Sequence, residues 1–136
     1  MVFAKNKESA SFLSGQVAKR NVGKYYYALI MGQIEPPLGE LVDHIKKDDK
    51  MHGSVICSEA DPEGKVARLS YQTIATRMIQ SDVVASLVKI KLETGRLHQI
   101  RLQFANQNHP LIGDRKYGAG ISDRIGRTVA LCSYQL

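Results

Sequence analysis

The stretch VVASLVKIKLETGRLHQIRLQF, residues 83–104, contains two different hydrophobic patterns in direct succession. Residues 83–92 alternate apolar side chains with serine and lysine, which is typical of a β-strand with one face in water. From residue 97 the apolar side chains recur at helical spacing, which predicts a helix over 97–107. The side of that helix expected to face the core holds Leu97, Ile100 and Phe104. A strand followed at once by a helix predicts a fold that contains both.

The rest of the chain adds mainly strands to this pair. Aromatic and β-branched runs bounded by Gly, Pro and Asp predict short strands, and one more helix precedes them. That helix is expected over residues 7–20, and the strands over 24–32, 38–45, 52–58, 66–76 and 128–136. Many strands with two helices predict an α+β fold, in which a mixed, largely antiparallel β-sheet is flanked by helices.

Length and composition limit the class of protein. The 136 residues suit one domain spanning 1–136, and 43% hydrophobic with 24% charged residues is close to the globular average. No apolar run approaches the ~18 residues of a membrane-spanning helix, so we expect a cytoplasmic protein with no membrane partner. Nineteen Lys and Arg against thirteen Asp and Glu give a net charge of +6, which favours a polyanionic partner such as nucleic acid.

The densest functional signal is ETGRLHQIR, residues 93–101. A helix that begins just after Gly95 would present unpaired backbone N–H groups and the positive end of its dipole, an arrangement that favours anions. Arg96 would lie at that site. His98 and Arg101, three residues apart, would share one face opposite the core-facing side.

Arg101 has two interpretations at this stage. Its planar guanidinium can hold a carboxylate or a phosphate through two parallel hydrogen bonds, which a lysine could not do. Alternatively, Arg101 makes a structural salt bridge and His98 is a polar residue satisfied within the fold. The spacing of the residues leaves both interpretations open.

Tyr25, Tyr26 and Tyr27 are consecutive on a predicted strand, so Tyr26 points to the opposite face from its two neighbours. A tyrosine exposed beside basic side chains can stack against a nucleic-acid base. The alternative is a core tyrosine whose hydroxyl is hydrogen-bonded. Both roles remain open for each of the three rings.

Several other kinds of chemistry lack their minimum residues. The sequence contains no GxGxxG, Walker, HExxH or GxSxG motif, which argues against the usual dinucleotide, nucleotide-triphosphate, metalloprotease and hydrolase sites. Histidines stand at positions 44, 52, 98 and 109, without the spacing of metal ligands to nearby Cys or carboxylates. We therefore expect no metal.

The segments GRLHQIR and NHPLIGDRKYG, within residues 95–118, closely resemble the late signature of RluA-type RNA pseudouridine synthases. In that family a G-R-x-H-Q-[I/L]-R run precedes G-H-P-[I/L]-x-G-D-x-x-Y-G. KYYYALIMG resembles the family's K-x-Y-x-A strand, and GKVAR with Tyr71 resembles its K-x-A-x-T-x-Y strand, although Leu69 replaces the threonine. VALCSYQL resembles A-L-H-A-x-x-L, with Cys132 in place of the usual histidine. The resemblance covers nearly the whole chain and implies part of the pseudouridine synthase catalytic fold.

The resemblance implies roles for individual residues. Tyr26 would stack on the target uracil, Arg101 would pair with the catalytic aspartate, and His98 and Ile100 would flank their pocket. The family flips a uridine out of RNA, and its aspartate attacks or deprotonates the ribose so that the base detaches, rotates and rejoins through carbon. No metal or organic cofactor takes part. The residues implied to contact RNA or the uridine are Arg96, His98, Gln99, Ile100, Arg115 and Lys116.

One part of the family's pattern is not matched. Its aspartate lies in an H-R-L-D-x-x-T-S-G run immediately upstream of the helix that begins here with FAKNK, whereas this sequence starts at Met1. Asp114 matches the family's late G-D position, where we expect a structural role. The aspartates of the chain, none of them in such a run, are Asp43, Asp48, Asp49, Asp61, Asp82, Asp114 and Asp123.

We therefore expect a fragment of a synthase that acts on ribosomal or transfer RNA, inactive by itself, in which Arg101 is a cation facing an unfilled pocket. An uncovered sheet edge would favour self-association. Two alternatives remain open. One is a catalytically inactive RNA-binding remnant that uses Arg96, Arg101, Arg115 and Lys116, and the other is a basic α+β domain with protein partners.

Overall fold

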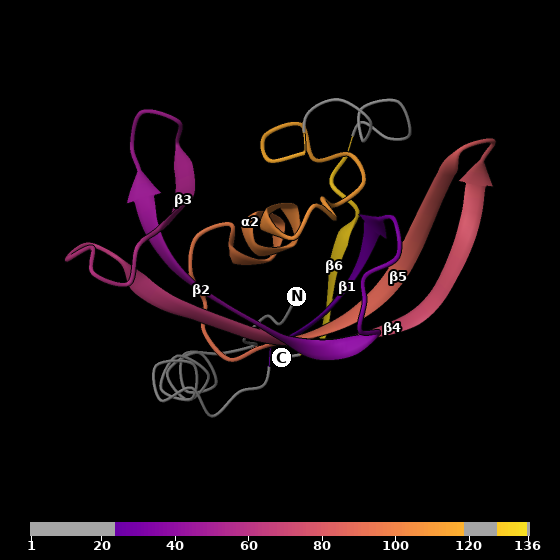
Figure 1. Cartoon of the computed structure of the whole chain (residues 1–136), viewed down its shortest axis with the longest axis horizontal. Helices are drawn as coiled ribbons and strands as arrows, with labels where there is room; N and C mark the ends of the chain where they lie inside the picture. The colour runs from indigo at the N-terminus through magenta and orange to yellow at the C-terminus, as the bar shows by residue number, and fades with distance from the viewer. Residues whose placement is uncertain (1–23, 119–127, 136) are drawn as a thin grey trace, which may run out of the picture.

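A curved sheet with a helix in its hollow makes up the described part of the chain. The computed structural model describes residues 24–118 and 128–135. Six strands form the sheet in the order β3-β2-β4-β5-β1-β6, and the helix α2 lies against its concave side (Figure 1). The elements are β1 (Lys24–Met31), β2 (Leu38–Asp48), β3 (Gly53–Cys57), β4 (Lys65–Gln80), β5 (Val83–Leu92), α2 (Gln99–Asn106) and β6 (Leu131–Gln135).

Every neighbouring pair of strands in this sheet is antiparallel. The expected α+β class with a largely antiparallel sheet is therefore confirmed. The strands expected at 24–32 and 83–92 agree with β1 and β5 to within one residue at each end. The helix expected at 7–20 lies outside the described residues.

The β1 strand shows how local sequence forms this sheet. Ala28 and Ile30 are buried in the core that α2 covers, whereas Leu29 between them is exposed. Tyr26 has the same parity as Ala28 and Ile30, and it packs against the same core. Alternation along a strand rich in aromatic and branched residues thus gives β1 one face toward α2 and one away from it.

The main core fills the space between the sheet and α2. Phe104 of the helix is completely buried there, with its ring edge-on to Tyr71 of β4 at a centroid distance of 5.8 Å. The other buried members are Ala28, Ile30, Ile34, Leu41, Leu69, Val88, Ile90, Ile100 and Leu111. Burial of a side chain of this size contributes about 1.5–3 kcal/mol, so the core holds α2 in place.

Two strands are longer than the sequence predicts. The charged run KKDDK, residues 46–50, falls between the strands expected at 38–45 and 52–58, yet it begins inside β2, because β2 pairs with β3 as far as Asp48 opposite Gly53. The strand expected at 66–76 continues to Gln80, because its partner β5 pairs with it up to that point. Cross-strand hydrogen bonding extends both strands through residues that are too polar or too exposed to show a strand pattern.

The helix begins later than expected. It starts at Gln99 rather than just after Gly95, and His98 precedes it in the left-handed region with a φ of 55°. The prediction that Leu97 faces the core is wrong, because Leu97 lies before the helix and is 44% exposed. Ile100 and Phe104, which do lie on the helix, are buried as predicted.

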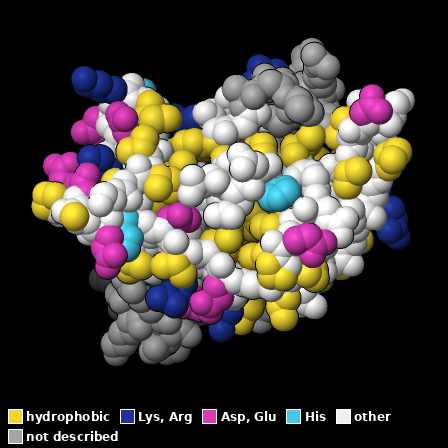
Figure 2. Space-filling view, viewed as in Figure 1, with side chains coloured by type: hydrophobic (Ala, Val, Ile, Leu, Met, Phe, Trp, Pro, Cys, Tyr) yellow, Lys and Arg dark blue, Asp and Glu magenta, His cyan; other side chains and the backbone are white. Residues whose placement is uncertain are grey.

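The two ends of the sheet differ in surface character. Figure 2 shows charged side chains of both signs over the β2–β3 end, while the far half of the β4–β5 hairpin exposes Ile74, Met78 and Ile79. The edge strands are β3 and β6, and the self-association expected at an open edge stays a prediction. Among the described residues, no helix is long and apolar enough to cross a membrane.

Candidate functional site

A buried ion pair lies beside the first turn of α2. Arg101 donates from Nε and Nη2 to the two carboxylate oxygens of Asp114, at 2.9 and 2.8 Å. The backbone N–H groups of Lys116 and Tyr117 also donate to this carboxylate, each at 3.1 Å. Asp114 is completely buried. The pair therefore ties α2 to the loop that follows it.

The surroundings of Asp114 act on its pKa in opposite directions. Burial alone would raise the pKa, but the hydrogen bonds from Arg101 and from the backbone of Tyr117 and Lys116 outweigh it and lower the pKa. The same hydrogen bond raises the pKa of Arg101. The expectation that Arg101 faces an unfilled pocket as a bare cation is wrong, because Asp114 neutralises it. The structural role expected for Asp114 agrees with this pair.

The Tyr117 side chain connects three elements at this point. Its hydroxyl accepts a hydrogen bond from Ser54 N–H of β3 at 3.0 Å and lies 2.8 Å from Nδ1 of His98. Its ring lies under the Arg101 guanidinium, 5.2 Å from ring centroid to Cζ. Burial, together with the positive charges of Arg101 and Lys116, lowers the pKa of His98, which favours the neutral imidazole. His98 lies before the helix rather than on the helix face where it was expected beside Arg101, but Tyr117 contacts both residues.

The Gln99 side chain fixes the bend before the helix. Its Oε1 accepts hydrogen bonds from the Thr94 hydroxyl at 2.8 Å and from Arg96 N–H at 3.0 Å, and its Nε2 donates to the Arg68 carbonyl at 3.1 Å. Thr94 and Gln99 are both buried. Because its amide bonds within the protein, Gln99 positions the backbone at Arg96 and presents little surface to a ligand.

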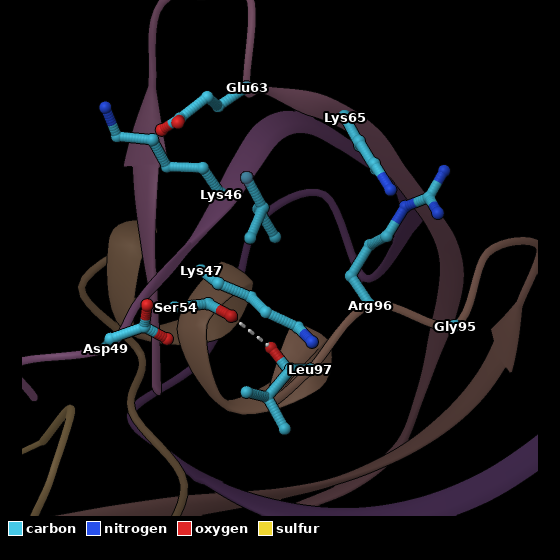
Figure 3. A pocket seen from close by; sticks show the side chains of 10 residues that line it. Lys46, Lys47, Asp49, Ser54, Glu63, Lys65, Gly95, Arg96 and Leu97 are labelled. Atoms are coloured by element: carbon cyan, nitrogen blue, oxygen red, sulfur yellow. Dashed lines mark hydrogen bonds between the residues drawn. The ribbon is translucent and has the colours of Figure 1, made fainter. Parts of the chain in front are cut away.

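A cavity of about 500 Å³ opens beside this bend (Figure 3). Arg96 reaches it and donates from Nε to the Val66 carbonyl at 3.0 Å, and the Ser54 hydroxyl donates to the Leu97 carbonyl on another side. Arg96 therefore stands at a cavity formed by β2, β3 and β4 rather than at the helix terminus where it was expected. The cavity is lined by Ile45, Lys46, Lys47, Asp49, Ser54, Glu63, Lys65, Gly95, Arg96 and Leu97.

Tyr26 lies on the sheet face that α2 covers. It is half-buried and packs against the core that includes Ile100, which is only 4% exposed. Tyr25 and Tyr27 lie on the opposite face, where both rings contact Tyr134 of β6. The predicted alternation of the three tyrosines is confirmed. Tyr26 and the helix that carries Arg101 are on the same side of the sheet.

The remaining two predicted RNA contacts, Arg115 and Lys116, are exposed in the loop after α2. The Lys116 ammonium donates to the carbonyl of Met51 and, at 2.9 Å, to that of His52. This loop is therefore attached to the β2–β3 turn. Within residues 24–118 and 128–135, no group of three or more His, Cys, Asp or Glu side chains is placed to hold a metal ion.

Comparison with known families decides the relationship of this chain. Residues 1–106 match the model of a family described as RNA pseudouridylate synthase. The chain belongs to this family. The matched segment includes β1 to β5, the whole of α2 and the bend before it.

Curated pseudouridine synthases confirm the RluA-type resemblance. An uncharacterized RNA pseudouridine synthase of Bacillus subtilis, YhcT, is 32% identical over 88% of this chain and 38% of its own length. The ribosomal large subunit pseudouridine synthase D of Borreliella burgdorferi is 29% identical over 100% of this chain and 40% of its own length. The dual-specificity RNA pseudouridine synthase RluA of Vibrio vulnificus is 30% identical over 88% of this chain and 47% of its own length. The chain thus spans less than half the length of these relatives.

Solved structures of the pseudouridylate synthase family share the fold. Human RNA Pseudouridylate Synthase Domain Containing 1 superposes with a TM-score of 0.84 at 28% identity, over 96% of this chain and 55% of that one. Human RNA Pseudouridylate Synthase Domain Containing 4 superposes with a TM-score of 0.69 at 25% identity, over 86% of this chain and 46% of that one. The described sheet and helix are therefore consistent with part of the catalytic fold of this family.

Within this family framework, sequence reasoning missed two features of the site. Tyr117 lies in the D-x-x-Y-G match, but its contacts with Ser54 and His98 join segments that are far apart in the sequence. Lys46 and Lys47 fall after the strand expected at 38–45 and have no predicted role, whereas in the structure they line the cavity beside Arg96. Only the three-dimensional arrangement brings these strands next to residues 94–97.

Proposed function

We propose that this chain is part of an RNA pseudouridine synthase that isomerises uridine in ribosomal or transfer RNA. The observation that carries the proposal is the position of Tyr26, on the same side of the sheet as α2 and Arg101, in a chain of this family. A uridine stacked on Tyr26 would lie over the face that presents Arg101. The catalytic roles of Tyr26 and Arg101 follow from the family resemblance.

The bonds that change in the isomerisation determine which groups the site needs. The bond from ribose C1′ to uracil N1 breaks, a bond from C1′ to C5 forms, and C5 loses a proton while N1 gains one. The reaction therefore needs no oxidant, reductant or metal. It needs a carboxylate beside the ribose and a surface that holds the base while it rotates.

Arg101 can still serve a second carboxylate. Its bonds to Asp114 use Nε and Nη2, which leaves the Nη1 group for a further acceptor. The aspartate of the H-R-L-D run that the resemblance implies would take that place. Holding one structural and one catalytic carboxylate on a single guanidinium would fix the catalytic group relative to α2.

Four aspartates in the described chain already have structural partners. Asp43 accepts hydrogen bonds from Gln103 and Asn106 of α2, and Asp61 pairs with Lys46 at 2.6 Å. Asp48 accepts from backbone N–H groups in the turn after β2, and Asp114 pairs with Arg101. This favours a catalytic carboxylate supplied by the H-R-L-D segment. It also favours the second candidate function, an RNA-binding protein without catalysis.

The test is a pseudouridine assay on the purified 136-residue chain, using a uridine-containing stem-loop labelled with tritium at C5. We expect no tritium release from the chain alone, and release when a peptide carrying an H-R-L-D-x-x-T-S-G segment is added. Turnover by the chain alone would show that one of its own aspartates is catalytic. RNA binding without turnover under both conditions would favour the non-catalytic function.

Tyrosine variants provide the matched control. In the reconstituted assay Tyr26→Ala should abolish detectable turnover, whereas Tyr27→Ala, which removes the neighbouring ring from the opposite face, should retain it. Equal losses in the two variants would contradict the role of Tyr26. Circular dichroism of both variants checks that the fold is retained.

A further inference from the structure

Three cationic side chains from different parts of the chain meet around Gly95. The Lys24 ammonium of β1 approaches Gly95 so closely that a Cβ added there would lie only 2.6 Å from Nζ. Arg96 is next in the chain, and its bond to the Val66 carbonyl brings it beside Lys65 of β4. Figure 3 shows the Lys65 and Arg96 side chains lying together above Gly95. We refer to Lys24, Lys65 and Arg96 as the Gly95 cluster.

The charge of the Gly95 cluster is not neutralised within the described structure. Across residues 24–118 and 128–135, none of its members lies within ion-pair distance of a carboxylate. The acidic side chains that line the cavity are Asp49 and Glu63, and Figure 3 shows the Glu63 carboxylate turned toward Lys46. Like charges gathered in one place repel each other, so the cluster is an electrostatic site for an anion.

The central member of the cluster is held rigidly. Hydrogen bonds fix Arg96 at both its backbone N–H, through the buried Gln99 amide, and its Nε, through Val66. The bond to Val66 uses Nε, so Nη1 and Nη2 of this cavity-lining arginine can donate to a phosphate. A cation positioned in advance loses less side-chain entropy on binding than a free surface lysine does.

The position of Lys24 relates the cluster to Tyr26. The two residues are two apart on β1, so their side chains leave the same face of the sheet about 7 Å apart. This spacing is on the scale of a single nucleotide. A base stacked on Tyr26 would therefore place its own backbone linkage, or the adjacent one, near Gly95.

We propose that the Gly95 cluster binds the RNA phosphate next to the uridine that stacks on Tyr26. The proposal rests on the proposed function, because it takes RNA as the ligand and Tyr26 as the stacking residue. The cavity beyond Arg96, with Lys46 and Lys47 on its wall, gives the strand a path away from that phosphate. The cluster thus sets where the RNA backbone enters relative to the reacting base.

Salt titrations of RNA affinity test the charge contribution. The full chain and the variants Lys24→Ala, Lys65→Ala and Arg96→Ala are compared on a short single-stranded RNA that contains one uridine. Each variant should bind several-fold more weakly at low salt, and its slope of log affinity against log salt should be shallower by about 0.7 for each phosphate that it no longer neutralises. The matched control is Lys91→Ala, a lysine of β5 that lies over Tyr25 on the opposite face.

A chemically altered RNA tests the position of the phosphate. One backbone linkage is made neutral as a methylphosphonate, either beside the uridine or at the far end of the RNA. The neutral linkage beside the uridine should weaken binding by the full chain several-fold. It should weaken binding by Lys24→Ala to a smaller extent, because that variant has already lost one of the three cations that pair with this phosphate. The distant linkage should not distinguish the two proteins.

The outcomes separate this inference from the proposed function. If the full chain binds RNA and the three cluster variants behave like Lys91→Ala, the cluster does not bind phosphate and the inference is overturned while the proposed function stands. Equal effects of the near and distant neutral linkages would overturn the placement beside Tyr26. A full chain that shows no salt-sensitive RNA binding would overturn both. Lys65→Arg and Lys24→Arg should restore most of the affinity that the alanine variants lack.

Discussion

Arg96 and Arg101 belong to the same motif, GRLHQIR, yet they lie in opposite electrostatic surroundings. Around Arg101 a completely buried carboxylate, two backbone donors to that carboxylate and an aromatic ring enclose the guanidinium. Around Arg96 two further cations gather, and the side chain lines a cavity. The first region holds the fold together, and the second remains available for a ligand.

This contrast shows what distinguishes a structural arginine from a binding one. Both side chains make a directional hydrogen bond through Nε, so hydrogen bonding by itself does not separate them. The difference lies in the accepting group, which is a neutral carbonyl for Arg96 and a buried carboxylate for Arg101. Only the carboxylate neutralises the charge.

The largest effect should come from replacing each arginine by methionine. Arg101→Met leaves Asp114 buried without its cation, so the free energy of unfolding should fall by about 3–5 kcal/mol. Arg96→Met removes one hydrogen bond to a carbonyl and should cost about 1 kcal/mol or less. Urea denaturation at neutral pH measures both. Similar losses in the two variants would contradict the division of roles.

The pH dependence of the stability lost in Arg101→Met gives a second test. In the parent protein the pKa of Asp114 is lowered, so its contribution to stability is present above the unfolded value of about 3.9 and disappears as pH falls through the folded value. In Arg101→Met, burial without the cation raises the pKa, so protonation relieves the unpaired charge as pH falls. The stability gap between the two proteins should therefore narrow between about pH 7 and about pH 4.

Asp114→Asn serves as the control for this pH effect. An amide cannot ionise, so the gap between Asp114→Asn and the double variant Arg101→Met with Asp114→Asn should not change over the same range. A gap between the parent and Arg101→Met that is constant with pH would show that the loss comes from packing rather than from charge.

The sequence predicts the elements of this fold more reliably than their ends. Alternation over 83–92 and the aromatic run at 24–32 identify two central strands because their side chains are buried on one face. The extensions of β2 to Asp48 and of β4 to Gln80 depend on partners across the sheet, and a local pattern carries no information about them. The prediction for Leu97 is wrong for the same reason, because the bend that ends at His98 is held by contacts from Gln99, Ser54 and Tyr117.

The site is predictable only as far as its residues lie in one motif. The motif identifies Arg96, His98 and Arg101, strand parity separates Tyr26 from its two neighbours, and the family resemblance selects Tyr26. The motif cannot predict that Asp114 is the partner of Arg101, because a loop separates the two residues and a salt bridge is only one of the alternatives that spacing leaves open. The approach of Lys24 to Gly95 depends on how β1 lies against the bend, so the cluster is visible only in the folded chain.

Removing a tyrosine hydroxyl should lower stability by a smaller amount, and more so beside Arg101 than on the opposite face of the sheet. Tyr117→Phe removes the hydroxyl that accepts from Ser54 N–H and contacts His98, and Ser54 is buried. Leaving that donor unpaired should lower the free energy of unfolding by about 1–3 kcal/mol. Tyr134→Phe, a change of the same size on an exposed ring, should stay within about 0.5 kcal/mol. Equal losses of unfolding free energy in the two variants would show that the hydrogen bonds of the Tyr117 hydroxyl do not stabilise the fold.

The smallest effect should come from Gly95→Ala, which changes no charge. The φ of Gly95 lies outside the left-handed region, so alanine fits the backbone, but its Cβ would displace the Lys24 ammonium. Because that group ends a flexible side chain, the free energy of unfolding should change by no more than about 0.5 kcal/mol. RNA affinity should fall, by less than in Lys24→Ala. If the displaced ammonium is the whole cause, adding Gly95→Ala to Lys24→Ala should lower the affinity no further. A further loss in the double variant would mean that Gly95 contributes to RNA binding apart from Lys24, and the Arg96 region would then depend on the shape of its backbone as well as on its charge.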